Sequence, residues 1–206
     1  ADTQGLPIYD RTLLQREMDL FPEWLLGRHL GLRLPDKQFA MLDQVFDYLI
    51  EQTLSQPRVL VHRDYHSRNL LVCDDANPGI IDYQDAVFGP ISYDLVSLLR
   101  DCYIRWPLEQ VTAWVAHYTE LACAAGLISR EQQAQMPVWF DLMGVQRHLK
   151  AAGIFARLNH RDGKSGYLAD IPRTLAYIVE VAEHRSEIAP LGELIQALVL
   201  PKLSDR

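Results

Sequence analysis

Short apolar runs separated by polar turns predict a small β element inside an otherwise helical chain. Residues 59–61, 70–73 and 79–82 each carry a short apolar run, and Asp, Asn, Pro or Gly residues bound these runs. Runs of this length, rich in Val, Ile and Leu, are typical of short strands. Because the turn at residues 74–79 contains Asn-Pro-Gly, we expect the second and third runs to form a hairpin.

Longer segments repeat their apolar positions at helical spacing. Asp10, Ser129 and Pro107 stand where helices commonly begin, and Gly126 stands where one commonly ends. Helices are expected, in chain order, at residues 10–20, 22–31, 35–56, 93–102, 107–126, 129–158, 171–187 and 190–200. A polar loop is expected at residues 159–166. The pattern predicts a mainly α protein with a small β-hairpin element.

Composition narrows the class of protein without naming a function. The chain has 206 residues, of which 49% are hydrophobic and 23% charged, an ordinary globular composition. A net charge of −7 disfavours nucleic acid or an anionic membrane as a partner. The three scattered cysteines form neither a disulfide framework nor a zinc-binding spacing, and no apolar run reaches the length of a membrane span. We therefore expect a cytoplasmic protein that binds no nucleic acid and no membrane.

Polar residues gather where the predicted strands end. Asp64 and Asn69 follow the first strand, and Asp82 ends the third. Mg²⁺ is commonly bound by one or two carboxylates with substrate phosphates and water, and phosphoryl transfer needs a further carboxylate to orient the attacking hydroxyl. The string HRDxxxxN followed by a strand-end Asp matches the catalytic-loop signature of kinases. We therefore predict Asp64 as the catalytic base, Asn69 and Asp82 as Mg²⁺ ligands, and ATP as phosphoryl donor.

A different reading of the same residues is a transition-metal hydrolase. His62, Asp64, His66 and Asp82 could form a metal cluster, because His and Asp are common ligands. His62 and Asp64 would then have to share one face of an extended segment, and Asn69 would have no role. We expect His62 to be a scaffold for the loop instead, and Arg68 to position the loop or contact phosphate.

The run HRDYHSRNLLV, continued by GIIDYQDAVFGPISYDLVSLL, resembles the aminoglycoside-phosphotransferase-like branch of the protein-kinase-like fold. His66 resembles the pattern of small-molecule kinases, where protein kinases usually carry Lys. The flanking segments FPEWLL (21–26) and RHLKAAG (147–153) are similar to those of bacterial N-acetylmuramate/N-acetylglucosamine kinases of cell-wall recycling. Tyr83-Gln84 departs from the Phe-Gly of protein kinases, which argues against a protein kinase.

The resemblance implies the C-terminal lobe of a kinase-like phosphotransferase that phosphorylates the anomeric hydroxyl of N-acetylmuramate or N-acetylglucosamine. It also implies that Asp94 anchors the catalytic loop by hydrogen bonds, although simple compensation of a helix dipole is the alternative. No glycine-rich phosphate loop and no Val-Ala-x-Lys-like lysine precedes residue 59, and a kinase needs both to hold ATP. We expect residues 1–206 to be one lobe, to lack its N-terminal nucleotide lobe as a partner, and to be inactive alone.

Six residues are candidates for binding the sugar: Glu23, Trp24, His66, Arg147, His148 and Lys150. Glu23 and Trp24 could hydrogen-bond to the sugar and stack on it, or could be a first-turn charge and a core side chain. The cations of residues 147–150 could meet an anionic substituent such as a lactyl carboxylate, or could form a solvated face.

Two rival functions remain open at this stage. Another small-molecule acceptor, such as an aminoglycoside, choline or homoserine, would suit the acidic balance of the chain, and Arg147 and Lys150 argue against a cationic one. A non-catalytic, pseudokinase-like binding module would commonly have lost one of the three loop residues Asp64, Asn69 and Asp82. All three are present.

Overall fold

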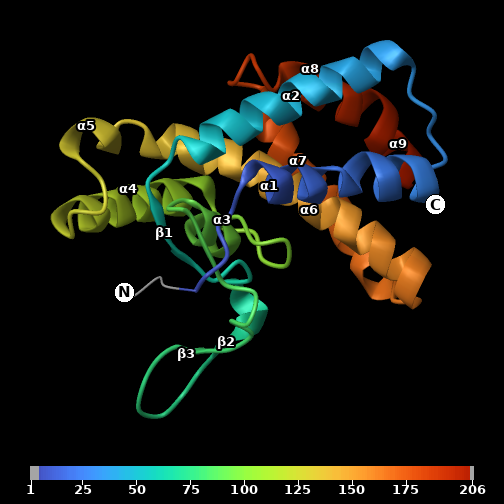
Figure 1. Cartoon of the computed structure of the whole chain (residues 1–206). Coiled ribbons are helices and arrows are strands. Elements are labelled where there is room, and N and C mark those ends of the chain that lie inside the picture. The colour runs from blue at the N-terminus through green and yellow to red at the C-terminus, as the bar shows by residue number, and fades with distance from the viewer. Residues whose placement is uncertain (1–4, 205–206) are drawn as a thin grey trace. The chain divides into compact units, whose positions relative to one another are not determined.

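The computed structural model describes residues 5–204 of the chain (Figure 1). These residues fall into two compact units. The first unit contains the chain up to Asp10 together with Thr53–Met143, and the second contains Arg11–Gln52 together with the chain from Gly144 onward. Two of the three boundaries lie within long helices, α2 (Asp36–Leu54) and α6 (Met136–Asp162), and the third lies just before Arg11.

Two short antiparallel strand pairs carry the first unit's central loop. β1 (Arg58–Val61) pairs with β4 (Val87–Pro90), and β2 (Leu70–Leu71) pairs with β3 (Gly79–Ile80). Val61 lies opposite Val87 in the register and both are buried, so this end of the first pair joins the core. In Figure 1 the turn between β2 and β3 extends away from the helices of this unit. The predicted strand at residues 59–61 is confirmed as β1. The predicted hairpin is also confirmed, but each of its strands has two residues instead of four.

The sequence did not predict β4, because Gly89 and Pro90 are poor strand formers. The structure gives Gly89 a packing reason, since a Cβ there would lie 3.0 Å from the Cβ of Tyr9. The Tyr9 N–H donates to the carbonyl of Phe88 at 3.0 Å. The segment before α1 therefore runs against β4, and a side chain at residue 89 would force Tyr9 to shift by a few tenths of an ångström.

Short and long helices complete the first unit. They are the 3₁₀-helix η2 (Ser67–Asn69), α3 (Tyr93–Leu99), α4 (Leu108–Ala124), α5 (Arg130–Gln133) and the start of α6. The predicted capping box is present: the Ser129 hydroxyl accepts the Gln132 N–H, and the Gln132 side chain accepts the Ser129 N–H. The box caps a helix of only four residues, however, and the long helix begins separately at Met136.

The described secondary structure of the second unit consists of helices joined by short turns. Its elements are α1 (Arg11–Met18), η1 (Phe21–His29), most of α2, the rest of α6, η3 (Ser165–Asp170), α7 (Ile171–Ala182), α8 (Ala189–Leu194), η4 (Ile195–Val199) and α9 (Leu200–Ser204). The predicted helices are confirmed in place. η1 is wound as a π-helix, with the Leu30 N–H donating to the Leu25 carbonyl at 3.0 Å.

The polar loop expected at 159–166 is wrong in its first half. α6 continues to Asp162 and ends at Gly163, whose φ of 68° is the left-handed conformation that terminates helices. The Lys164 N–H closes this end by donating to the Leu158 carbonyl at 3.0 Å. The polar residues of the last turns are the exposed face of a helix, which a composition-based reading mistakes for a loop.

Gly153 shows what the RHLKAAG segment does in packing. A Cβ at this position would lie 2.4 Å from the carbonyl carbon of Leu20, which no real structure accommodates without movement. α6 can therefore approach the turn between α1 and η1 only because residue 153 is glycine. Among the described residues, no helix has both the length and the apolar character needed to cross a bilayer.

Candidate active site

The candidate site begins where β1 ends, and the carboxylate of Asp94 holds this point. The His62 N–H donates to Asp94 Oδ2 at 2.7 Å, and the Arg63 N–H donates to Asp94 Oδ1 at 3.1 Å. Asp94 stands in the first turn of α3, which packs in the core through Tyr93 and Val96. A carboxylate fixed on a buried helix therefore fixes the backbone that leads directly to Asp64.

The charge of Asp94 also acts on its surroundings. Burial raises the pKa of Tyr118, and the Asp94 carboxylate adds to the rise. Tyr118 thus stays protonated at neutral pH, and its hydroxyl donates to the carbonyl of Ile91 at 3.2 Å, just before α3. This contact ties α4 to the residues that precede the anchoring helix.

Two residues of the site have strained backbones. Arg63 has φ 74° and Asp82 has φ 69°, and they are the only non-glycine residues with positive φ in the described part of the chain. Such conformations cost on the order of 1–3 kcal/mol and persist only where the surroundings enforce them. Both positions coincide with or adjoin the predicted functional groups: Arg63 immediately precedes Asp64, and Asp82 is itself the predicted metal ligand.

Asn69 connects the two predicted carboxylates. Its Nδ2 donates to the backbone carbonyl of Asp64 at 2.9 Å and lies 3.4 Å from Asp82 Oδ2. The other oxygen of Asp82 accepts from Gln84 Nε2 at 3.0 Å. Asp64 is partly buried and Asp82 is exposed. The structure therefore brings Asn69 and Asp82 side by side, with Asp64 on the same loop.

This arrangement fits a hard divalent cation. The amide nitrogen of Asn69 faces both the Asp64 carbonyl and Asp82 Oδ2, which leaves the Asn69 Oδ1 available as an oxygen ligand. Mg²⁺ typically takes a small number of protein oxygens and completes its shell with phosphate and water. Within residues 5–204, no three His, Cys, Asp or Glu side chains gather closely enough to hold a metal ion. The transition-metal cluster of His62, Asp64, His66 and Asp82 is therefore not formed.

The structure places His62 inside the loop rather than on its surface. Its side chain is buried, at 7% exposure, and packs edge-on against Tyr65 with ring centroids 5.9 Å apart. Neither ring nitrogen has a hydrogen-bond partner among the described residues. This position suits a packing role beneath the loop.

Asp101 is a site residue that sequence reasoning missed. Its Oδ2 accepts both the N–H and the hydroxyl of Ser67, at 3.0 and 2.6 Å. Asp101 follows α3 and lies seven positions after Asp94, a spacing that would return to the same face of the helix predicted at residues 93–102. That spacing is the one signal the sequence offered.

Arg68 and His66 both contact the ring of Tyr103. The Arg68 guanidinium lies 3.5 Å from the ring centroid, and the His66 ring packs edge-on at 5.4 Å. Arg68 is exposed, whereas His66 is partly buried. Tyr103 therefore lines the outer side of the loop between Asp64 and Asn69.

Comparison with known proteins agrees with this geometry. The profile of the phosphotransferase enzyme family matches residues 2–127, which is more than half of the chain and includes the whole loop. The chain belongs to the phosphotransferase enzyme family. The resemblance noted from the sequence and the kinase-like, mainly helical fold are thereby confirmed.

Three relatives of this phosphotransferase carry the name N-acetylmuramate/N-acetylglucosamine kinase. The protein from Pseudomonas putida is 51% identical over 193 residues, covering 94% of this chain and 57% of the relative. Those from Neisseria meningitidis and Pseudomonas aeruginosa are 50% and 46% identical, covering 97% and 96% of this chain and 60% and 59% of theirs. The chain spans about three fifths of the length of these curated relatives.

The second unit of the phosphotransferase holds Glu23 and Trp24. Glu23 Oε1 pairs with Arg28 Nη2 at 3.2 Å, and the Arg28 guanidinium lies 4.0 Å from the centroid of the Trp24 ring system. Trp24 is half-buried, so it is neither a full core side chain nor an open platform. Arg28 already covers one ring face, and a sugar would have to displace it or use another edge.

The cationic segment of α6 is buried rather than solvated. Arg147 is 6% exposed and His148 is 1% exposed, with the His148 ring stacked on Tyr177 at 4.8 Å. Lys150 Nζ pairs with Glu17 Oε1 at 2.9 Å. The solvated-face alternative is therefore wrong, and the charge of Lys150 is met by a carboxylate of its own unit.

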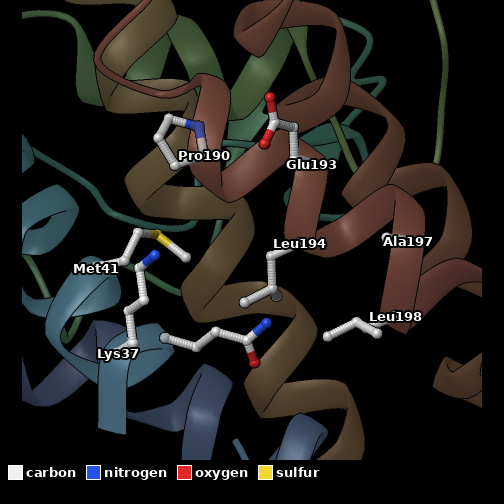
Figure 2. A pocket seen from close by; sticks show the side chains of 8 residues that line it. Lys37, Met41, Pro190, Glu193, Leu194, Ala197 and Leu198 are labelled. Atoms are coloured by element: carbon white, nitrogen blue, oxygen red, sulfur yellow. The ribbon is translucent and has the colours of Figure 1, made fainter. Parts of the chain in front are cut away.

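One shallow groove of about 410 Å³ lies in the second unit between α2 and the α8–η4 segment (Figure 2). Met41 and Leu194 line it, with Lys37 and Glu193 among its few charged groups. None of the predicted site residues contributes to it.

Proposed function

We propose that the protein transfers the γ-phosphoryl group of ATP to the anomeric hydroxyl of N-acetylmuramate or N-acetylglucosamine. The observation that carries the proposal is the position of Asn69, whose amide joins the Asp64 backbone to the Asp82 carboxylate. The loop after β1 and the residue Asp82 after β3 thus offer together a proton acceptor and a pair of oxygen ligands. The names of the three relatives support the choice of amino sugar.

In this proposal Asp64 orients the acceptor. Its carboxylate accepts the proton of the sugar hydroxyl as that oxygen attacks the γ-phosphorus, and the bond from phosphorus to the bridging oxygen breaks to release ADP. Asn69 Oδ1 and the Asp82 carboxylate would hold Mg²⁺, which neutralises phosphate charge when bound. Asp94 and His62 keep the loop in position, and Arg68 positions the loop or contacts a phosphate.

We assign the clamp for ATP to a separate N-terminal nucleotide lobe of the full-length protein. The sequence before residue 59 has neither a glycine-rich phosphate loop nor the lysine that accompanies it. Residues 1–206 would then be the C-terminal catalytic and acceptor lobe and would turn over negligibly alone. Because ATP is the donor, we place the reaction in the cytoplasm.

A coupled ADP-release assay of the full-length protein tests the proposal. The panel contains N-acetylmuramate, N-acetylglucosamine, an aminoglycoside, choline and homoserine, each with ATP and Mg²⁺. The proposal predicts turnover with the two amino sugars and at most background with the others. Preference for an aminoglycoside, choline or homoserine would replace the acceptor assignment, and absence of turnover with every acceptor would favour a binding module.

The isolated chain supplies a second test. Residues 1–206 should show no measurable phosphorylation under conditions in which the full-length protein is active. Detectable sugar phosphorylation by the fragment would contradict the assignment of the ATP clamp to another lobe. Product analysis by ³¹P NMR would separate transfer to the anomeric hydroxyl from transfer to another hydroxyl.

A further inference from the structure

We propose that Asp101 is a positioning residue that holds the metal-binding half of the loop, acting through Ser67 and Tyr103. The inference rests on the proposed function, because it assigns Asp101 an effect on the metal ligand Asn69. It adds a second anchor to the one that Asp94 provides. The two anchors serve different parts of the loop.

Asp101 is a buried carboxylate that accepts three hydrogen bonds from neighbouring segments of the chain. Asp101 is 1% exposed. One oxygen accepts the Ser67 N–H at 3.0 Å and the Ser67 hydroxyl at 2.6 Å, and the other accepts the Tyr103 N–H at 2.8 Å. A buried charge is tolerated only when such donors satisfy it, and hydrogen bonds to a charged acceptor are the strong ones. Asp101 therefore fixes two segments of backbone at once.

The first of these segments carries Asn69. Ser67 is the first residue of η2 and Asn69 is the last, so a single 3₁₀ turn separates the anchor from the metal ligand. The Asn69 N–H donates to the His66 carbonyl at 2.9 Å within this turn. A shift of Ser67 would therefore shift the side chain of Asn69.

The second segment carries Tyr103, whose ring contacts the loop from outside. Because Asp101 holds the Tyr103 backbone, it also sets the ring against which Arg68 and His66 pack. Residues 66–68 are thus held by the hydrogen bonds of Ser67 to Asp101 and by the contacts of His66 and Arg68 with the ring of Tyr103. Both restraints originate from one buried side chain.

Asp94 and Asp101 divide the loop between them. Asp94 binds the N–H groups of His62 and Arg63, before Asp64. Asp101 binds Ser67, after Asp64 and two residues before Asn69. Loss of the Asp101 carboxylate should therefore raise the Mg²⁺ concentration that the enzyme needs for half-maximal rate. If Asp101 were purely structural, its loss would lower only the stability of the protein.

Three variants of the full-length protein test this division. Asp101→Asn removes the charge, and Ser67→Ala removes one of the three hydrogen bonds. Asp141→Asn is the matched control. Asp141 is also buried, at 7% exposure, and it pairs at 2.8 Å with Nη2 of Arg100, the residue that precedes Asp101. Asp141 itself does not contact the loop through this pair. Each variant is measured for melting temperature, for the Mg²⁺ concentration giving half-maximal rate, and for the KM of N-acetylmuramate.

Residues that orient metal ligands commonly cost 10- to 100-fold in metal affinity or activity when changed. Asp101→Asn should raise the half-maximal Mg²⁺ concentration about tenfold or more, with acceptor KM changed less than about threefold. Ser67→Ala should shift it in the same direction by a smaller factor. Asp141→Asn should lower the melting temperature and leave the Mg²⁺ requirement at the wild-type value.

Hydrogen exchange of the unliganded protein gives a readout that does not depend on turnover. In Asp101→Asn, peptides covering residues 66–71 should exchange faster, whereas those covering residues 93–99 should not change. The proposal is overturned if the Asp101 and Asp141 variants behave alike in both measurements, or if exchange at 66–71 is unaltered. Absence of sugar turnover in the wild type would refute the proposed function, and the exchange data would still decide the anchoring role.

Discussion

The two units of this chain each use a carboxylate as an organising group, but they use it differently. In the first unit, Asp94 and Asp101 accept hydrogen bonds from backbone N–H groups of a loop. In the second unit, Glu17 accepts from the side chains of Lys150 and Gln146, at 2.9 and 3.1 Å. The first kind of contact fixes the path of the backbone, and the second satisfies charge inside a helical core.

This difference distinguishes the candidate site, held by Asp94 and Asp101, from the helical core around Glu17. The carboxylates of the first unit hold a loop whose Asn69, like the neighbouring Asp82 after β3, remains at least partly exposed to solvent. The Glu17 cluster leaves little of itself exposed: Glu17 is 4% exposed and Gln146 is 0% exposed. Changes to the loop should therefore appear in kinetics, and changes to the cluster should appear mainly in the free energy of unfolding.

The largest effect is expected at Asp64. Asp64→Asn keeps the shape of the side chain and removes the charge that, in the proposed mechanism, accepts the proton of the sugar hydroxyl. A general base typically contributes roughly a hundred- to ten-thousand-fold in rate, so kcat of the full-length protein should fall by about that factor. The acceptor KM should stay within a few-fold, as steady-state kinetics with N-acetylmuramate would measure.

Breaking the Glu17 cluster is the corresponding test for the second unit. Glu17→Gln leaves Lys150 without its counter-charge in a nearly buried position, and removing one partner of such a pair costs about 3 kcal/mol. Urea denaturation would measure this loss. The double variant Glu17→Leu, Lys150→Met should recover most of it, because an apolar pair of similar size needs no counter-charge. If Glu17→Gln is as stable as the wild type, the Glu17 cluster does not stabilise the second unit, and the proposed contrast between the two units is wrong.

Asp94→Asn should have an intermediate effect, confined to kinetics and loop dynamics. The amide can accept one of the two backbone hydrogen bonds, and its NH₂ group opposes the other donor. A hydrogen bond to a charged group is worth about 1.5–3 kcal/mol, so kcat should fall by at least about tenfold. The Mg²⁺ requirement should stay within about twofold of the wild-type value. A large rise in the Mg²⁺ requirement would show that Asp94, like Asp101, positions the metal ligands, and would contradict the proposed division of the loop.

The smallest effect is expected at an exposed pair. Arg11 Nη1 and Asp47 Oδ1 lie 2.7 Å apart, but the two side chains are 51% and 63% exposed. Exposed pairs contribute roughly 0–1 kcal/mol, so Asp47→Asn should change the free energy of unfolding by less than about 1 kcal/mol. A loss as large as that of Glu17→Gln would show that burial is not what distinguishes the cluster.

The sequence was informative where function depends on local spacing. The order of Asp64, Asn69 and Asp82 along the chain predicted a loop and hairpin that the structure contains, because strand ends and turns are short-range features. For Asp94, the family resemblance implied the anchoring role, whereas its place in the first turn of a helix fitted dipole compensation nearly as well. These groups needed no knowledge of distant parts of the chain.

The sequence was uninformative where function depends on distant contacts. Glu17 and Gln146 are 129 positions apart, and nothing near Lys150 shows that a carboxylate meets it. Asp101 has no signature beyond its spacing from Asp94, and β4 contains Gly and Pro residues that local preference assigns to a turn. In each of these cases tertiary packing, rather than local sequence, determines the contacts of the residue. For the same reason the solvated-face alternative for residues 147–150 was wrong.

The most direct test of the account is a Mg²⁺ titration of Asp82→Asn and Asp64→Asn in the full-length protein. If Asp82 holds the metal and Asp64 takes the proton, raising Mg²⁺ should recover part of the rate lost in Asp82→Asn and none of that lost in Asp64→Asn. If Asp64→Asn retains most of the wild-type rate, or if Mg²⁺ restores it while Asp82→Asn stays unresponsive, the assignment of roles in the loop is wrong.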